Sequence, residues 1–254
     1  MPITLTYGEH PSQHIHRWGP RYADTGPAPI AVLLHGGWWR DHHGTGLMDP
    51  LATDLTDAGW AVWNVEYRRT GHDGGGWPQT RDDVTRALEL LTTVAAREPD
   101  DLDPTRVVVI GHSAGGHLAL LTAPESPTTH VVALAPVTDL ERSAVAGLGE
   151  DAVASFLGPA PGAELYTDRS PLYRLPLGVP QVVVHGDADP RVPVEHSRDY
   201  VAAARAFGDQ VEYHEVAGAD HFAVIDPAHP AWTGVRAHLA VVAHGADASS
   251  GEKW

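Results

Sequence analysis

Short apolar runs, rich in β-branched residues, alternate along the chain with longer segments in which apolar residues recur every three or four positions. The short runs predict buried strands at 30–34, 60–65, 107–110, 131–135, 182–184 and 210–215. The longer segments predict amphipathic helices at 47–58, 78–96, 116–123, 194–207 and 228–242. Because strands alternate with helices, we expect an α/β fold, in which a mostly parallel sheet carries helices on both faces.

Two parts of the chain depart from this alternation. Residues 3–7 and 13–18 predict two antiparallel strands joined by a turn at 8–11, which brings the sheet to roughly eight strands. Residues 138–178 contain several prolines and one predicted helix, at 151–157, and we expect them to form a short lid insertion. The sequence therefore predicts a single domain over 1–244, followed by a flexible polar tail at 245–254.

The composition narrows the classes of partner. The 17 basic and 33 acidic residues give a formal net charge of −16, which argues against nucleic acid or an anionic membrane as partner. The chain has no cysteine, so disulfides and thiolate metal sites are excluded. Its 17 histidines are mostly scattered, and the adjacent pair His42 and His43 does not readily face one ion, so we expect no metal and no cofactor.

Location and assembly rest on weaker signals. No apolar run approaches the roughly 20 residues that span a bilayer. The first residues, Met-Pro-Ile-Thr, carry neither a basic stretch nor a hydrophobic segment, so we expect no signal peptide. A cytoplasmic enzyme, monomeric or homodimeric, is the default expectation.

A candidate nucleophile follows the run at 107–110. Gly111-His112-Ser113-Ala114-Gly115 matches the pattern G-x-S-x-G between a predicted strand and a predicted helix. A sharp turn from strand to helix needs small residues beside its apex and leaves the serine hydroxyl exposed above the sheet. The pattern alone is weak, because small residues cluster by chance in many loops, but its flanking elements favour a catalytic Ser113.

Ser113 needs a histidine to accept its proton and a carboxylate to orient that histidine. Asp189 and His221 follow it, each in a loop after a predicted strand, in the chain order serine, acid, histidine. Asp187 is an alternative acid, but Asp189 lies nearer the loop tip. We interpret His112, His117, His185 and His214 as packing or hydrogen-bonding residues.

The negative oxygen formed during acyl transfer needs backbone N–H donors. We expect them from Gly37 and Trp38, in the run His35-Gly36-Gly37-Trp38-Trp39, and from Ala114 at the start of the helix. A simple glycine turn at the strand end is the alternative interpretation of that run. For pocket walls we expect Trp38, Trp77 and Phe222, whereas Trp39 is better explained as core.

Together these motifs resemble the α/β-hydrolase serine esterases over about residues 30–242. Within that superfamily, His-Gly-Gly-aromatic-Trp is similar to the carboxylesterase and kynurenine formamidase branch. The hormone-sensitive-lipase-like group usually has three glycines after the histidine, and Trp38 takes the third place here. Glu66 stands where these families usually have Asp before Tyr-Arg, and we interpret Glu66 and Arg68 as structural.

The resemblance implies a three-layer α/β-hydrolase fold and a serine hydrolase that cleaves a small carboxylic ester through an acyl-enzyme. An arylformamidase that cleaves a small amide is the first alternative, and a non-hydrolytic biosynthetic enzyme on the same fold is the second.

Overall fold

The computed structural model describes residues 2–21, 26–158 and 161–244. Eight strands form one sheet in the order β1-β2-β4-β3-β5-β6-β7-β8. β1 and β2 pair antiparallel with each other, and β2 pairs antiparallel with β4, whereas all other neighbours are parallel. The strands are β1 (Ile3–Thr6), β2 (His14–Trp18), β3 (Ala28–Leu34), β4 (Ala61–Val65), β5 (Leu102–His112), β6 (His130–Leu134), β7 (Gln181–Gly186) and β8 (Val211–Val216). The predicted mostly parallel, eight-stranded sheet is confirmed.

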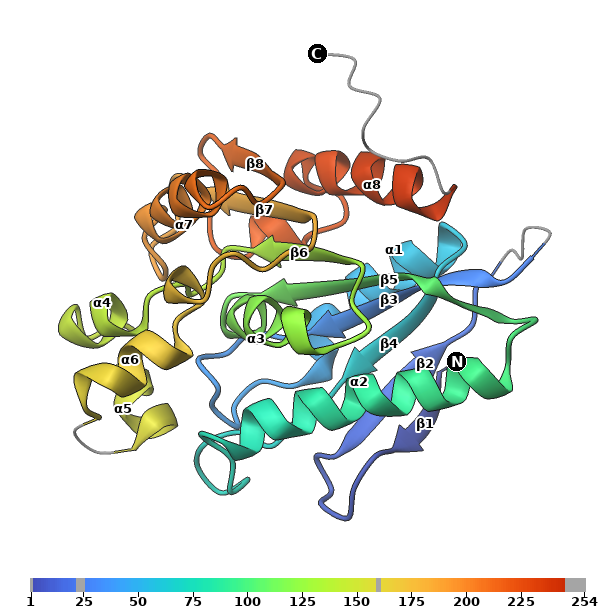
Figure 1. Cartoon of the computed structure of the whole chain (residues 1–254), viewed down its shortest axis with the longest axis horizontal. Helices are drawn as coiled ribbons and strands as arrows, with labels where there is room; N and C mark the ends of the chain where they lie inside the picture. Colours follow the sequence, from blue (N-terminus) through green and yellow to red (C-terminus); the bar gives the residue numbers. More distant parts are fainter. Residues whose placement is uncertain (1, 22–25, 159–160, 245–254) are drawn as a thin grey trace.

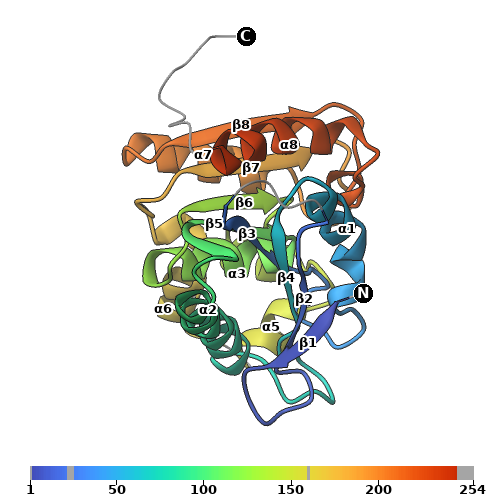
Figure 2. The same ribbon diagram turned by 90° about the vertical axis from the view of Figure 1, so that its right-hand side faces the viewer.

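Helices cover both faces of this sheet, because successive residues of a fully buried strand point to opposite sides. Val32 of β3 belongs to the core cluster on one face, and its neighbour Leu33 belongs to the cluster on the other. The first face is covered by α2 (Gln79–Arg97), α3 (Ala114–Thr122) and α7 (Glu195–Ala206). The second is covered by α1 (Asp49–Asp57) and α8 (Pro230–Ala243), and Figure 2 shows α1 and α2 on opposite sides of the strands.

The insertion holds more structure than the sequence indicates. Besides α5 (Ala152–Leu157), which matches the predicted helix, it contains α4 (Leu140–Val145) and α6 (Ala163–Arg169). Both added helices are only two turns long or less, too short for their periodicity to stand out. Figure 1 shows the three helices grouped at one end of the molecule, beyond α3 and away from α8.

The parallel register brings the ends of distant strands to one edge. Leu34 of β3 pairs with Gly111 of β5, and Leu134 of β6 pairs with Val184 of β7. The loops after β3, β5 and β7 therefore leave from the same edge of the sheet, where open α/β sheets bind their ligands. No helix within the described ranges is both long and apolar enough to cross a bilayer. The predicted tail at 245–254 lies outside the described residues.

Candidate active site

Ser113 occupies a strained turn between β5 and α3. Its backbone has φ 56° and ψ −116°, a combination that costs a non-glycine residue free energy. Surrounding bonds hold it there: its N–H donates to the carbonyl of Leu134 at 2.8 Å, and its own carbonyl accepts from the N–H of His117 at 3.0 Å. The buried hydroxyl makes no hydrogen bond with any described residue. A serine on such a strained strand-to-helix turn is typical of a nucleophile, although its hydroxyl forms no hydrogen bond with His221 in this structure.

The two glycines that flank the turn are fixed by backbone contacts. A Cβ on Gly111 would lie 2.2 Å from the carbonyl oxygen of Gly115. A Cβ on Gly115 would lie 2.1 Å from the carbonyl oxygen of Leu34. Neither contact involves a flexible side chain, so the close approach of helix, strand and turn requires both glycines.

Asp189 and His221 meet at the same edge of the sheet. Asp189 lies in the loop after β7 and His221 in the loop after β8, and Asp189 Oδ2 lies 2.6 Å from His221 Nδ1. Because Nδ1 bonds the carboxylate, Nε2 is left as the nitrogen that can exchange a proton. Asp187 instead accepts the N–H of Gly218 at 2.6 Å, which is a loop-stabilising contact.

The Asp189 carboxylate is strongly stabilised in its charged form. Its Oδ1 accepts the backbone N–H groups of Arg191 and Val192 at 2.8 and 3.0 Å. Burial works to raise the pKa of Asp189, but hydrogen bonds from His185 and His221 outweigh it and hold that pKa well below its usual range. The ionised carboxylate keeps the His221 ring in one orientation through the contact with Nδ1.

The loop after β3 has an unusual backbone. Gly37, Trp38 and Trp39 have φ values of 115°, 54° and 56°, three successive residues in the left-handed region. Among the described residues, neither the N–H of Gly37 nor that of Trp38 donates a hydrogen bond, and Ala114 supplies the first N–H of α3. Three backbone N–H groups without acceptors among the described residues therefore lie beside Ser113: two in the loop after β3 and one at the start of α3.

A buried carboxylate, that of Glu66, holds the loop after β3 by hydrogen bonds. Glu66 follows β4 and accepts from His35 Nε2 at 2.8 Å and from the N–H of Thr45 at 3.1 Å. Burial works to raise the pKa of Glu66, but His35 and Arg69 outweigh it and keep that pKa below its usual range. The structural role predicted for Glu66 is confirmed by these contacts.

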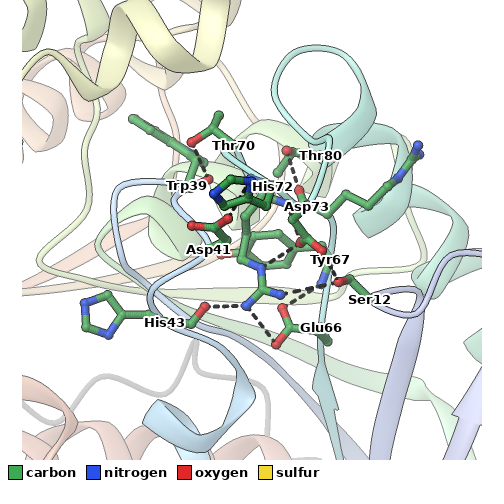
Figure 3. A network of polar contacts seen from close by, with 12 residues as sticks. Ser12, Trp39, Asp41, His43, Glu66, Tyr67, Thr70, His72, Asp73 and Thr80 are labelled. Atoms are coloured by element: carbon green, nitrogen blue, oxygen red, sulfur yellow. Dashed lines mark hydrogen bonds and ion pairs between the residues drawn. The ribbon is translucent and has the colours of Figure 1, made fainter.

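Arg69 extends this support to the rest of the loop. Its guanidinium bonds Asp73 and Ser12 Oγ, lies 3.3 Å from Glu66 and donates to the carbonyl of His43. Figure 3 shows Glu66, His43, Ser12 and Asp73 gathered in this network. The loop from His35 to Thr45 is thus tied to the protein at both ends.

A cavity of about 200 Å³ opens above Ser113. It is lined by Gly37, Trp38, Arg40, His42, His43, Leu47, His112, Ser113, Gly149, Glu150, Arg191, His221 and Phe222. Two of these residues, Gly149 and Glu150, come from the insertion. Arg40, Glu150, His43 and Arg191 were not identified from the sequence, because polar and charged residues in loops give no signal of the cavity they share.

Trp77 does not line this cavity. A packed series of rings separates it from Trp38: Trp38 and Trp39 have centroids 6.0 Å apart, Trp39 and Phe156 4.4 Å, and Phe156 and Trp77 6.2 Å. The guanidinium of Arg169 lies 4.3 Å from the Trp77 ring on a different part of the surface. Contrary to the expectation from the sequence, Trp77 is therefore not a wall of the cavity at Ser113, because Phe156 from the insertion packs between it and Trp39. Trp39 is core, as predicted, with 1% of its surface exposed.

Comparison with known proteins assigns the chain to a family. The sequence profile of the BD-FAE family matches residues 20–203. The chain belongs to the BD-FAE family. Esterase LipC of Mycobacterium tuberculosis is 30% identical over 92% of this chain and 62% of its own length, and the probable carboxylic ester hydrolase LipM of the same organism is 29% identical over 91% and 58%. This BD-FAE chain thus spans about 60% of the length of these two relatives.

The fold is shared with solved structures. An acetyl ester-xyloside bifunctional hydrolase from Caldicellulosiruptor lactoaceticus superposes with a TM-score of 0.81 at 20% identity, over 96% of this BD-FAE chain and 97% of the other. The predicted α/β-hydrolase fold is confirmed. Among the described residues, no three His, Asp or Glu side chains are grouped so that they would hold a metal ion.

Proposed function

We propose that the chain is a serine hydrolase that cleaves a small carboxylic ester through an acyl-enzyme. The observation that carries the proposal is the shared cavity: the uncommitted hydroxyl of Ser113 and the His221 ring both line it, and Asp189 holds that ring at Nδ1. The relatives LipC and LipM bear the names of ester hydrolases, which supports the same activity.

In the proposed reaction, Ser113 Oγ attacks the acyl carbon while His221 Nε2 accepts the hydroxyl proton. Asp189 stabilises the imidazolium that forms. The backbone N–H groups of Gly37, Trp38 and Ala114 bind the negative oxygen of the tetrahedral intermediate. His221 then gives its proton to the leaving alcohol, and a water that it deprotonates releases the acid. No metal or organic cofactor takes part in these steps.

The cavity suits a small substrate. Its volume of about 200 Å³ is below the roughly 300–1,000 Å³ of sites for drug-sized ligands. Trp38 and Phe222 supply aromatic walls beside the nucleophile. A short acyl group, such as acetyl, fits such a volume better than a fatty acyl chain.

Labelling and hydrolysis test the proposal together. A fluorophosphonate should attach to Ser113, and p-nitrophenyl acetate should be hydrolysed. Ser113→Ala should abolish the labelling and lower kcat by about 10⁴-fold or more. Labelling of Ser113 without turnover of any ester would indicate a non-hydrolytic enzyme, and labelling of another residue would contradict the assignment.

An amide-cleaving activity is the alternative, because the loop His35-Gly36-Gly37-Trp38-Trp39 is similar to that of kynurenine formamidases. The deciding assay compares p-nitrophenyl acetate with N-formylkynurenine. A preference for the latter of more than about a hundredfold in kcat/KM, or about 2.7 kcal/mol, would favour the formamidase.

A further inference from the structure

The loop that carries Asp189 also carries an arginine without an ionic partner. Within the described residues, the Arg191 side chain forms neither a salt bridge nor a hydrogen bond, and its Cζ lies 5.0 Å from the centroid of the Phe222 ring. Its backbone N–H donates to Asp189 Oδ1 at 2.8 Å. The main chain is therefore fixed to the acid, and the guanidinium is placed over an aromatic face at the cavity wall.

This cation stands out in an acidic chain, in which 33 carboxylates accompany 17 basic residues. Arg40, the other arginine that lines the cavity, donates to the carboxylate and the carbonyl of Glu150 at 3.2 and 2.5 Å. Glu150 is the one acidic side chain among the described residues lining the cavity, so no lining carboxylate is left for Arg191.

The histidine beside Arg191 in the cavity does not supply a second positive charge. His43 lines the same cavity, and its pKa is lowered by burial and then by His35, His42 and Arg191. Arg191 therefore carries the permanent positive charge that lines the cavity without an ion pair among the described residues. Such a charge attracts anions locally even when the whole protein is negative.

The position of Arg191 tells which part of an ester it would meet. In the proposed reaction His221 protonates the leaving oxygen, so the alcohol part of the ester must lie on the His221 side. The rings of His221 and Phe222 have centroids 5.4 Å apart, and Arg191 lies over the Phe222 ring. The guanidinium is thus beside the space for the leaving group rather than the space for the acyl group.

We propose that Arg191 is a specificity residue that binds a carboxylate on the alcohol part of the ester, while Phe222 packs against that part. The inference rests on the proposed hydrolase function and names its substrate class: small esters whose leaving alcohol carries an anionic group. A guanidinium binds a carboxylate through two parallel N–H donors, which also orients the leaving group.

The test compares 4-acetoxybenzoate, which is anionic, with its neutral methyl ester. Both esters have the same acyl group. The measured quantity is the kcat/KM of the anionic ester divided by the kcat/KM of the neutral ester. We expect Arg191→Gln to lower this ratio about tenfold relative to wild type, and Arg191→Lys to lower it less. The wild-type ratio should also fall as salt is raised, because the contact is charged and exposed. The matched control is Arg86→Gln, which removes one exposed charge from α2 without touching the cavity.

A ratio within threefold of wild type in Arg191→Gln would overturn the proposal, as would an equal fall in Arg86→Gln. Binding of 4-hydroxybenzoate, measured by isothermal titration, does not depend on turnover. Weaker binding to Arg191→Gln than to wild type supports the anion site, and equal binding contradicts it. A wrong proposal for the hydrolase function itself would give a different result, because the wild type would then hydrolyse neither ester.

Discussion

The imidazole of His112 donates from Nε2 to the backbone carbonyl of His221 at 2.9 Å, and the two rings have centroids 4.7 Å apart. Burial, followed by the charge of His221, lowers the pKa of His112 to about 3, so this ring is neutral in ordinary buffers. The residue before the nucleophile therefore supports the main chain of the candidate base. The contact joins the loop after β8 to the end of β5.

Removing this donor should displace His221. We expect His112→Leu to lower kcat by about 10- to 100-fold, because small displacements of a catalytic group cost that much. His112→Gln keeps a donor on a side chain of similar reach and should retain more activity. Steady-state kinetics with p-nitrophenyl acetate measure the effect. A kcat unchanged in His112→Leu, with the protein folded, would contradict the positioning role.

The two acids of the loop after β7 give a second, matched prediction. Asp189→Asn should lower kcat by about 10³- to 10⁴-fold, because an amide in place of the carboxylate neither fixes the His221 tautomer nor stabilises the imidazolium. Asp187→Asn keeps the oxygen that accepts from Gly218 and should change kcat by less than about threefold. Kinetics of both variants at one pH decide between them. The reverse order would identify Asp187 as the acid.

The sequence predicted the sheet and the chain order of the candidate triad because both depend on local patterns. Strands buried on both faces appear as continuous apolar runs, and the strand–turn–helix context marks Ser113. β5 begins at Leu102 rather than at 107, because the polar residues of its exposed first half hide the strand. α3 begins at Ala114 rather than at 116, because two glycines obscure its first turn.

The walls of the cavity, and the aromatic packing beside it, were harder to predict because they depend on tertiary placement. Phe156 of the insertion packs between Trp39 and Trp77, and no pattern in the sequence specifies that order of rings. The position of Arg191 over Phe222 likewise joins two loops that follow different strands. Such contacts arise only after the sheet has brought its loop ends together.

The turn around Ser113 gives a prediction about stability. Gly115→Ala would place its Cβ 2.1 Å from the carbonyl oxygen of Leu34 and 2.5 Å from that of His35. Because backbone must move to relieve these contacts, we expect a loss of at least about 3 kcal/mol in the free energy of unfolding. Gly46→Ala meets nothing within 4 Å and should change this free energy by less than about 1 kcal/mol. Denaturant unfolding of both variants is the measurement, and equal stability would contradict the packing argument.

The buried carboxylate of Glu66 gives a prediction about the candidate oxyanion loop. Glu66→Gln keeps the size of the side chain but removes the charge that faces His35 and Arg69. We expect the free energy of unfolding to fall by about 1–3 kcal/mol and kcat to fall several-fold, because the loop from His35 to Thr45 loses its charged anchor. Glu89→Gln, on the exposed face of α2, is the control. A variant with wild-type stability and kcat would show that the charge of Glu66 is dispensable.

Buried neutral histidines predict how stability depends on pH. Burial is the main cause that lowers the pKa of His112 to about 3 and the pKa values of His117 and His196 to about 4. In the unfolded chain these rings titrate near the ordinary value of about 6.5. Between pH 6.5 and 4 the unfolded state therefore binds more protons than the folded state, so stability falls as the pH falls.

In this window each such histidine adds up to about 1.4 kcal/mol per pH unit to the slope of the free energy of unfolding against pH. That slope disappears as the pH approaches the folded-state pKa of the histidine, because the folded state then binds the proton too. Above pH 6.5 the three rings are neutral in both states and add no slope. His117→Gln keeps a donor for the carbonyl that His117 Nε2 contacts, that of Arg169, and should reduce the slope between pH 6.5 and 4.5. The exposed His72 is the control, since His72→Gln should leave the slope unchanged. Denaturant unfolding at several pH values measures both, and an undiminished slope in His117→Gln would contradict the assignment of this acid sensitivity to His117.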